Sequence, residues 1–281
     1  MMRSCGLYKD NLNNLWEFIL KDNDELVYIK TADGGDIGRE IKIDDGVADF
    51  SYGIDENNRV HLAYITSRGE VKYCTEDKDS WHSKALYFFK PGANIVESVS
   101  LMMVGGTVHI FFLFHSAGAW TEGYLLHGVW DGSSEKAHLA GRIGPIPGTR
   151  SYYGAEVLGV SGIYVFYLSS GDGQSLNVTC FNGSEWSSPK ALYEITGEEI
   201  QTNIAQHRGE LHVLSLSKED DVYALEHVLM DTECTVRKIN RIYQSRIKLS
   251  GPVLLSGGDA LWAFWSEDGS ILYSIYEGIW T

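Results

Sequence analysis

The 281-residue sequence predicts an all-β fold, a six-bladed β-propeller of four-stranded antiparallel blades. A strand-like pattern recurs six times, and repetition at about 20–50 residues is typical of repeat folds such as propellers. The composition agrees, because 16 Tyr, 8 Trp and 30 Gly but only 5 Pro suit many short strands joined by tight turns. One such domain can use a chain of this length, so we assign residues 1–281 to a single propeller.

Each repeat contains an anchor, an aromatic side chain or histidine that follows an aliphatic or similar residue in an apolar-rich strand. The six anchors are Trp16, His61, His109, Tyr164, His212 and Trp262. Their separations of 45, 48, 55, 48 and 50 residues match four-stranded units with short turns. The predicted blades cover approximately residues 1–46, 47–94, 95–148, 149–198, 199–246 and 247–281. We expect the anchors to pack between blades, since histidines in different blades lie too far apart to share a metal ion.

The elements of each unit follow in a constant order. A turn rich in Asp and Asn, such as "DENN" at Asp55–Asn58, precedes the anchor strand and suits a hairpin reversal. A third strand follows about a dozen residues later, as in "EVKYCT" and "SILYSI". A glycine- or aspartate-containing turn, often with a tryptophan, then leads to a fourth strand. The phrases "SWHSKALY" at Ser80–Tyr87 and "EWSSPKALY" at Glu185–Tyr193 begin this strand in units two and four.

The last blade is predicted to lack a complete outer strand. After "SILYSIYEG" only "IWT" remains, while the N-terminus begins almost at once with the first strand of blade one. Unpaired strand edges invite pairing with other chains. We therefore expect the sixth blade to offer an open edge to another chain or to a C-terminal extension.

The turns between third and fourth strands carry a family resemblance. "TADGGDIG" at Thr31–Gly38, "TEDKDSW" at Thr75–Trp81 and "TCFNGSEW" at Thr179–Trp186 resemble degenerate copies of the Asp-box, Ser/Thr-x-Asp-x-Gly-x-Thr-Trp. This motif is the bacterial neuraminidase repeat of sialidase-type propellers. In that family it is a fold element on the face opposite the active site, so the resemblance implies a propeller and does not by itself imply activity.

Charge and cysteine content exclude several classes of function. The net charge of −15, without a Lys/Arg cluster, argues against nucleic acid and anionic membranes as partners. No apolar run approaches the ~20 residues of a membrane span, and the first ten residues lack the apolar stretch of a secretion signal. As written, the chain is expected in the cytoplasm, or outside the cell if a signal peptide was removed. The four cysteines are widely spaced, which predicts free thiols and neither a metal site nor a cofactor.

Unit three departs from its neighbours and is the predicted binding region. We call the end of a blade where its first strand begins the upper end, because loops between second and third strands lie there too. Such loops carry function in rigid scaffolds. The upper loop "FHSAGAWTEG" and the exit "GRIGPIPGTRSYYG" place aromatic rings and a guanidinium group there, a combination suited to glycans or peptides. The predicted ligand-binding residues are His115, Trp120, Arg150, Tyr152 and Tyr153.

Two functions remain open, and binding is favoured over catalysis. The first is a non-catalytic propeller that recognises a glycan or peptide at its upper face. The alternative is a glycoside hydrolase of sialidase-like type, for which the resemblance implies three arginines, a Tyr/Glu nucleophilic pair and an Asp acid. Arg68, Arg150 and Arg246, with Tyr153 and Glu97, are the candidates for these roles. For another glycosidase, paired carboxylates could come from Asp49, Glu97, Glu194 and Glu198.

Overall fold

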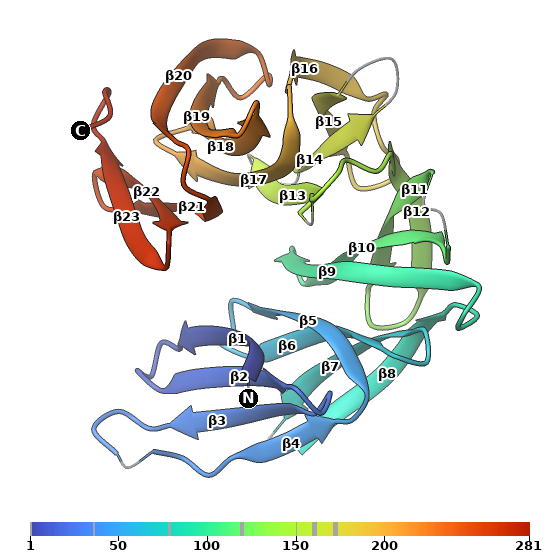
Figure 1. Ribbon diagram of the computed structural model, residues 1–281. Helices are drawn as coiled ribbons and strands as arrows, with labels where there is room; N and C mark the ends of the chain where they lie inside the picture. The colour runs from blue at the N-terminus through green and yellow to red at the C-terminus, as the bar shows by residue number, and fades with distance from the viewer. Residues whose placement is uncertain are drawn as a thin grey trace. The chain divides into compact units, whose positions relative to one another are not determined.

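The chain folds into six antiparallel β-sheets, shown as separate blades in Figure 1. The computed structural model describes residues 2–35, 37–77, 80–118, 121–149, 151–158, 162–170 and 174–281. Every regular element in these ranges is a β-strand. The strand order is that of the predicted six-bladed β-propeller, which is thereby confirmed. The chain divides into two compact units, Met1–Leu139 and Ala140–Thr281, and each is described by itself.

The first unit contains the first two blades and most of the third. Blade 1 consists of β1 (Met2–Lys9), β2 (Leu15–Lys21), β3 (Leu26–Thr31) and β4 (Ile41–Asp44). Blade 2 consists of β5 (Val47–Ile54), β6 (Val60–Thr66), β7 (Glu70–Asp77) and β8 (Ser80–Phe88). Blade 3 consists of β9 (Asn94–Val104), β10 (Thr107–Ser116), β11 (Gly123–Trp130) and β12 (Glu135–Ile143). In each blade, neighbours in sequence are neighbours in the sheet.

The second unit contains the remaining blades. Blade 4 consists of β13 (Tyr153–Leu158), β14 (Gly162–Ser170), β15 (Gln174–Phe181) and β16 (Lys190–Glu194). Blade 5 consists of β17 (Glu198–His207), β18 (Glu210–Glu219), β19 (Val222–Met230) and β20 (Val236–Ser245). Blade 6 has only β21 (Leu249–Gly257), β22 (Ala260–Glu267) and β23 (Ser270–Tyr276). The last blade is thus three-stranded, as its short C-terminal sequence predicted.

The chain end turns back onto the outer edge of β23. Tyr276 forms a β-bridge with Trp280, and the backbones of Ile275 and Thr281 exchange two hydrogen bonds of 3.2 and 3.0 Å. These residues cover one end of the edge. Within the described part of the chain, no complete strand pairs with β23 on that side.

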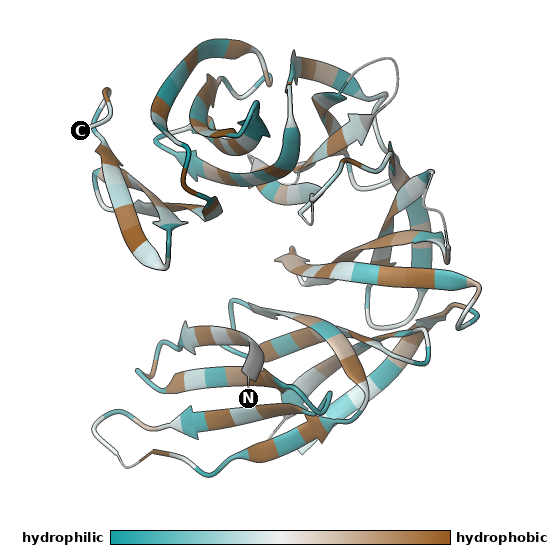
Figure 2. Cartoon of the chain, in the orientation of Figure 1, coloured by the Kyte–Doolittle hydropathy of each residue, from teal (hydrophilic) through white to brown (hydrophobic). Residues whose placement is uncertain are grey.

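Apolar side chains form separate layers between neighbouring blades. One cluster joins blades 1 and 2, a second joins blades 2 and 3, and a third joins blades 5 and 6. Polar and apolar residues alternate along many strands, as Figure 2 shows, because successive side chains of a strand point to opposite faces. Among the anchors, Trp16, His61, His109 and His212 are buried. Trp16 belongs to the layer between blades 1 and 2, and the three histidines are buried within their own blades.

Three anchor histidines pair with a ring on the adjacent strand of their own blade. His61 Nδ1 lies 2.6 Å from the Tyr73 hydroxyl, His109 Nδ1 lies 2.9 Å from His127 Nε2, and His212 Nδ1 lies 2.9 Å from His227 Nε2. Burial lowers the pKa of His109 and His212 to about 4, that of His227 to about 3 and that of His127 to about 2. These rings are neutral at pH 7, which a buried hydrogen-bonded pair requires.

The innermost strands carry β-bulges that join neighbouring blades. The pairing register shifts between Glu97 and Ser100 in β9, between Glu198 and Gln201 in β17, and between Ser250 and Val253 in β21. A bulge takes a backbone N–H out of its own ladder. Side chains of the preceding blade accept such N–H groups. The donor–acceptor pairs are Val99 N to Asp49 Oδ2 (2.9 Å), Ile200 N to Thr149 Oγ1 (2.9 Å) and Gly251 N to Gln201 Oε1 (2.9 Å).

A second set of bonds follows further along the same strands. Leu101 N donates to Ser51 Oγ (3.1 Å), and Leu254 N donates to Asn203 Oδ1 (2.8 Å). Each pair spans 50 or 51 residues of sequence, so the bonds recur with the blade period. Blades within a unit are therefore linked by side-chain acceptors as well as by apolar packing.

The cysteines and the absence of helices complete the description of the fold. Cys5, Cys74, Cys180 and Cys234 are free thiols, of which Cys74 and Cys234 are buried. No helix in the described ranges is long and apolar enough to cross a membrane.

Mild acid should weaken the fold through the buried histidine pairs. A histidine in the unfolded chain has a pKa of about 6.5. Below that pH, protons bind the unfolded chain more tightly than the folded one. The neutral histidines therefore make their full contribution to the free energy of unfolding above about pH 6.5. As the pH falls toward 4, this free energy declines by about 1.4 kcal/mol for each buried histidine and each pH unit. Thermal denaturation followed by circular dichroism between about pH 7.5 and about pH 4.5 measures it. A midpoint temperature that stays constant over this pH range contradicts the prediction. The control is His82→Gln, which removes an exposed histidine and should leave the pH dependence of the midpoint as in the native chain.

Removing one inter-blade acceptor should destabilise the chain. In Asn203→Ala, the buried Leu254 N–H loses its acceptor, which costs about 1–3 kcal/mol of unfolding free energy. Gln206→Ala changes an exposed side chain of the same strand and should shift stability by less than about 0.5 kcal/mol. Urea denaturation compares the two variants. Equal stabilities would show that the bond contributes nothing.

Candidate functional site

A hollow of about 850 Å³ lies at the upper ends of the innermost strands of the second unit. Its lining comes from the segment before β13 and from the beginnings of β17 and β21. The lining residues are Gly148, Ser151, Glu198, Glu199, Gln201, Lys248 and Ser250. All are polar or glycine, so the hollow offers hydrogen-bond donors and acceptors from three blades.

Glu199 has a strained backbone at the edge of this hollow. Its φ is +52°, in the left-handed region that residues with a Cβ seldom adopt. The matching bulge residues are Ser98 in blade 3, with φ of +57°, and Gly251 in blade 6, with φ of +61°. The Glu199 N–H donates to the Pro147 carbonyl at 2.7 Å, and the N–H of the next residue, Ile200, donates to Thr149 Oγ1. The bulge thus holds a glutamate where blade 6 has glycine.

Gly148 makes room for this glutamate. A Cβ added to Gly148 would lie 2.5 Å from Glu199 Cγ, and the glycine itself has φ of +72°. Any other residue at position 148 would therefore be strained and would also push the glutamate side chain away. The glycine before β13 and the glutamate in β17 therefore fit together, and both are needed to place this carboxylate.

Three side chains hold the Glu199 carboxylate. The Tyr223 hydroxyl lies 3.3 and 3.2 Å from its two oxygens. Lys218 Nζ lies 3.5 Å from Oε1, and Lys248 Nζ lies 3.5 Å from Oε2. The Tyr223 ring is buried, whereas Lys248 is 70% exposed. One carboxylate therefore has a rigid phenol on one side and a mobile ammonium group on the other.

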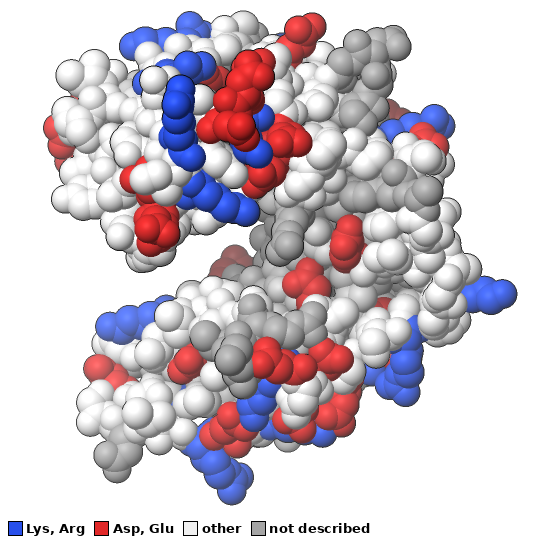
Figure 3. All heavy atoms as spheres, in the orientation of Figure 1, with Lys and Arg blue, Asp and Glu red and all other residues white. Residues whose placement is uncertain are grey.

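Charges of both signs meet around this carboxylate. Lys218 also donates a hydrogen bond to Glu198 at 3.2 Å. This hydrogen bond, together with the negative charges of Glu198 and Glu199, raises the pKa of Lys218. Burial raises the pKa of Tyr223, and the negative charge of Glu199 raises it further. Figure 3 shows acidic and basic side chains gathered together on the second unit, over the region of β17 to β20. The phenol is protonated at pH 7, and the hollow is neither strongly acidic nor strongly basic.

The structure places His115 and Glu97 together at the upper end of blade 3. His115 is buried, its Nε2 lies 3.2 Å from Glu97 Oε1, and its Nδ1 lies 3.1 Å from the Ser116 carbonyl. The predicted binding residue and a predicted catalytic carboxylate are thus in contact. Both belong to the first unit, and neither is among the lining residues of the hollow.

The other predicted binding residues are partly described. Tyr152 is buried, with its hydroxyl 3.3 Å from both the N and the O of Ile146, so its ring presents almost no surface to a ligand. Tyr153 is half-buried at the start of β13, where it pairs with Tyr167. Trp120 and Arg150 lie outside the described residues. Ser151, between Arg150 and Tyr152, lines the hollow.

Sequence reasoning identified one carboxylate of the hollow and missed its partners. Glu198 was among the predicted carboxylates, and the structure places it in the lining. Glu199, Tyr223, Lys218 and Lys248 were not singled out. The repeat offered one signal, since the glycine at position 251 marks a left-handed bulge that position 199 fills with glutamate. Of the candidate arginines, Arg68 lies in the first unit and Arg246 in the second, while Arg150 lies outside the described residues.

The described residues hold no group of three His, Cys, Asp or Glu side chains arranged to bind a metal ion. The side chains of Glu198, Glu199, Gln201 and Lys248 can form hydrogen bonds and ion pairs in the hollow.

Comparisons with solved structures find propellers that act on or bind carbohydrate. The fold is similar to that of a polysaccharide lyase described as an ulvan lyase, with 10% identity, a TM-score of 0.65 and coverage of 96% of this chain and 78% of that one. It is similar to an alpha-L-arabinanase from Penicillium chrysogenum, with 9% identity, a TM-score of 0.61 and coverage of 84% and 80%. The SapL1 lectin, in complex with alpha methyl fucoside, shares 12% identity, with a TM-score of 0.57 and coverage of 100% and 95%.

These similarities show the fold alone, because every identity is far below 25%. No protein-family model matches the sequence, and no curated protein matches it significantly. Propellers of this kind include both lectins and glycan-processing enzymes, so function must be argued from the site.

Proposed function

We propose that this chain is a non-catalytic glycan-binding propeller and that the hollow around Glu199 is its binding site. The proposal keeps the binding site at the upper ends of the blades, where the sequence predicted it. It moves the centre of the site from Trp120 and Tyr152 to the bulge of β17.

The strained backbone of Glu199 is the observation that carries the proposal. A left-handed conformation costs a residue with a Cβ roughly 1–2 kcal/mol, and glycine avoids this cost at the matching position of blade 6. Backbone strain of this kind persists where the surrounding structure fixes it, and strained residues cluster at active sites and ligand-binding sites. The neighbouring lysines, the phenol and Gly148 all act to place the same carboxylate.

The chemistry of the lining suits a polyhydroxylated ligand. Glu198, Glu199 and Gln201 accept hydrogen bonds, while Lys248, Ser151 and Ser250 can donate them. A sugar needs both in close alternation. A volume of about 850 Å³ is large enough for several rings, since sites for drug-sized ligands have about 300–1,000 Å³. The lectins and glycan-processing enzymes that share this fold support carbohydrate over peptide.

A glycoside hydrolase of sialidase-like type is the second candidate, and the contact between Tyr223 and Glu199 favours it. A tyrosine nucleophile next to a glutamate is the pair that the sialidase resemblance implies, and these two groups are in hydrogen-bond range. The raised pKa of Tyr223 favours binding over catalysis, because burial and the Glu199 charge both oppose formation of the phenolate.

Glu199→Gly separates a functional role from a structural one. Glycine relieves the strain, which offsets the loss of the contacts with Tyr223 and the two lysines, so the variant should keep about the native stability, yet its glycan affinity should fall roughly tenfold or more. A glycan array first identifies a ligand, and isothermal titration calorimetry then measures its affinity. Ser98→Gly makes the same change at the matching bulge of blade 3 and should leave affinity unchanged.

Three other results have distinct meanings. Unchanged affinity in Glu199→Gly contradicts the assignment of the site, and a peptide bound in place of every glycan contradicts the ligand class. Release of sugar from 4-methylumbelliferyl glycosides, lost in Tyr223→Phe, would establish the hydrolase instead.

A further inference from the structure

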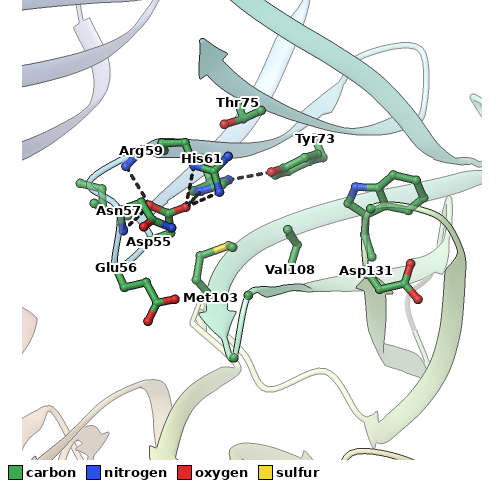
Figure 4. A pocket seen from close by; sticks show the side chains of 15 residues that line it. Asp55, Glu56, Asn57, Arg59, His61, Tyr73, Thr75, Met103, Val108 and Asp131 are labelled. Carbon is green, nitrogen blue, oxygen red and sulfur yellow. Dashed lines mark hydrogen bonds and ion pairs between the residues drawn. The ribbon is translucent and has the colours of Figure 1, made fainter.

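A second pocket, of about 250 Å³, lies between blades 2 and 3 at their lower ends, the ends opposite the beginnings of β5 and β9. It belongs entirely to the first unit. The turn from β5 to β6 and the side chains of His61 and Tyr73 form one wall. The turns at Gly105–Gly106 and at Asp131–Gly132, with Met103, Val108 and Trp130, form the other. Figure 4 shows the two walls facing each other.

The wall from blade 2 is a fixed polar network. Asp55 accepts hydrogen bonds from the backbone N–H groups of Asn57 (2.9 Å) and Arg59 (2.8 Å) and from Arg59 Nε (2.8 Å). His61 Nε2 lies 3.3 Å from the same carboxylate, and His61 Nδ1 lies 2.6 Å from the Tyr73 hydroxyl. Burial opposes ionisation of Asp55, but the hydrogen bonds from Arg59 outweigh it and lower the pKa of Asp55. The charge of Asp55 is therefore satisfied within the turn.

This network leaves a small set of groups for a ligand. The Arg59 side chain is 60% exposed and has more N–H donors than Asp55 uses. Glu56 and Asn57 are exposed beside it and also line the pocket. The Tyr73 hydroxyl, 2.6 Å from His61 Nδ1, is a further polar group of the lining.

The wall from blade 3 is apolar and rigid. Trp130 lines the pocket, and Lys84 Nζ lies 3.6 Å from the centroid of its ring. Val108 is buried beneath it. Asp131, at the rim, is engaged by its own turn, since it accepts bonds from the N–H groups of Ser133 and Ser134 at 2.8 and 2.7 Å. The glycines of both turns leave peptide groups uncovered by side chains.

The corresponding turn of blade 1 lacks these ligand-directed groups. Asp10 there accepts bonds from Leu12 N, Asn14 N and Trp16 Nε1, so its turn has the same construction as that of Asp55. Where blade 2 has Glu56 and Arg59, blade 1 has Asn11 and Asn14. The construction of the turn therefore does not require Glu56 or the arginine.

We propose that this pocket binds a single uncharged sugar ring and is a carbohydrate site separate from the hollow around Glu199. An apolar wall with a tryptophan faces one carboxylate, one guanidinium group, one amide and one phenol, which together suit a ring with one apolar face and several hydroxyl groups. Three carboxylates, those of Asp55, Glu56 and Asp131, line the pocket against the single guanidinium group of Arg59, which disfavours an anionic ring. The volume is below the ~300 Å³ lower bound of drug-sized sites, which limits the ligand to about one ring.

Saturation-transfer difference NMR on the full chain tests this proposal with methyl glycosides as probes. The panel is methyl fucoside, methyl rhamnoside, methyl galactoside and methyl glucoside, with methyl glucuronide as the charged comparison, each at up to about 10 mM. At least one neutral glycoside should show transfer, and its affinity should fall roughly tenfold in Trp130→Ala and in Glu56→Ala. Asn11→Ala, at the matching position of blade 1, should retain the native affinity.

The variants keep the test decisive. Glu56 is exposed and holds no part of the turn, so Glu56→Ala remains informative if Trp130→Ala does not fold. This proposal shares its ligand class with the proposed function. The two sites have different lining residues, so substitutions can test each proposal without the other. The decisive comparison is made in the Glu199→Gly background, where the hollow no longer contributes. Transfer that persists in Glu199→Gly and is lost when Glu56→Ala is added supports the pocket. Transfer kept in the double variant, transfer from the glucuronide alone, or no transfer from any probe overturns it.

Discussion

The hydrogen bond from a bulged inner strand to a side chain of the preceding blade is the constraint on which the arrangement of blades depends. Asp49, Thr149 and Gln201 each accept an N–H that the bulge has removed from its own sheet. A buried N–H without a partner costs about 1–3 kcal/mol, so each bond holds two neighbouring blades in one register. Apolar layers alone would permit sliding, because they are not directional.

The same device builds the candidate site. In β17 the bulge residue is Glu199, and the bond from Ile200 to Thr149 holds the strand in the shape that turns the carboxylate toward Tyr223 and the lysines. In β9 and β21 the corresponding residues are Ser98 and Gly251. A structural feature shared by several blades thus becomes a candidate functional feature in one of them through a single change of side chain.

Much of the fold follows from the sequence, because hydrophobic period and turn chemistry are local. Trp16, His61 and the other anchors mark the second strand of each blade, and the shortage of residues after Tyr276 foretells the three-stranded last blade. Bulges are harder to foresee, since the break that one extra residue makes in the alternation of side chains also occurs where a strand ends. The sequence around Tyr152 resembles an exposed aromatic patch, but the hydroxyl bonds to the Ile146 backbone and the ring is buried. The pocket beside Arg59 depends on the packing of two blades, which no single turn reveals.

A crystal structure of Thr149→Val tests the central claim most directly, because valine keeps the shape of threonine and removes the acceptor of the Ile200 N–H. The account predicts that the β17 bulge relaxes, that residue 199 leaves the left-handed region, and that the contact between Tyr223 and Glu199 is lost. A structure in which Glu199 keeps its native φ and its contact with Tyr223 would contradict it.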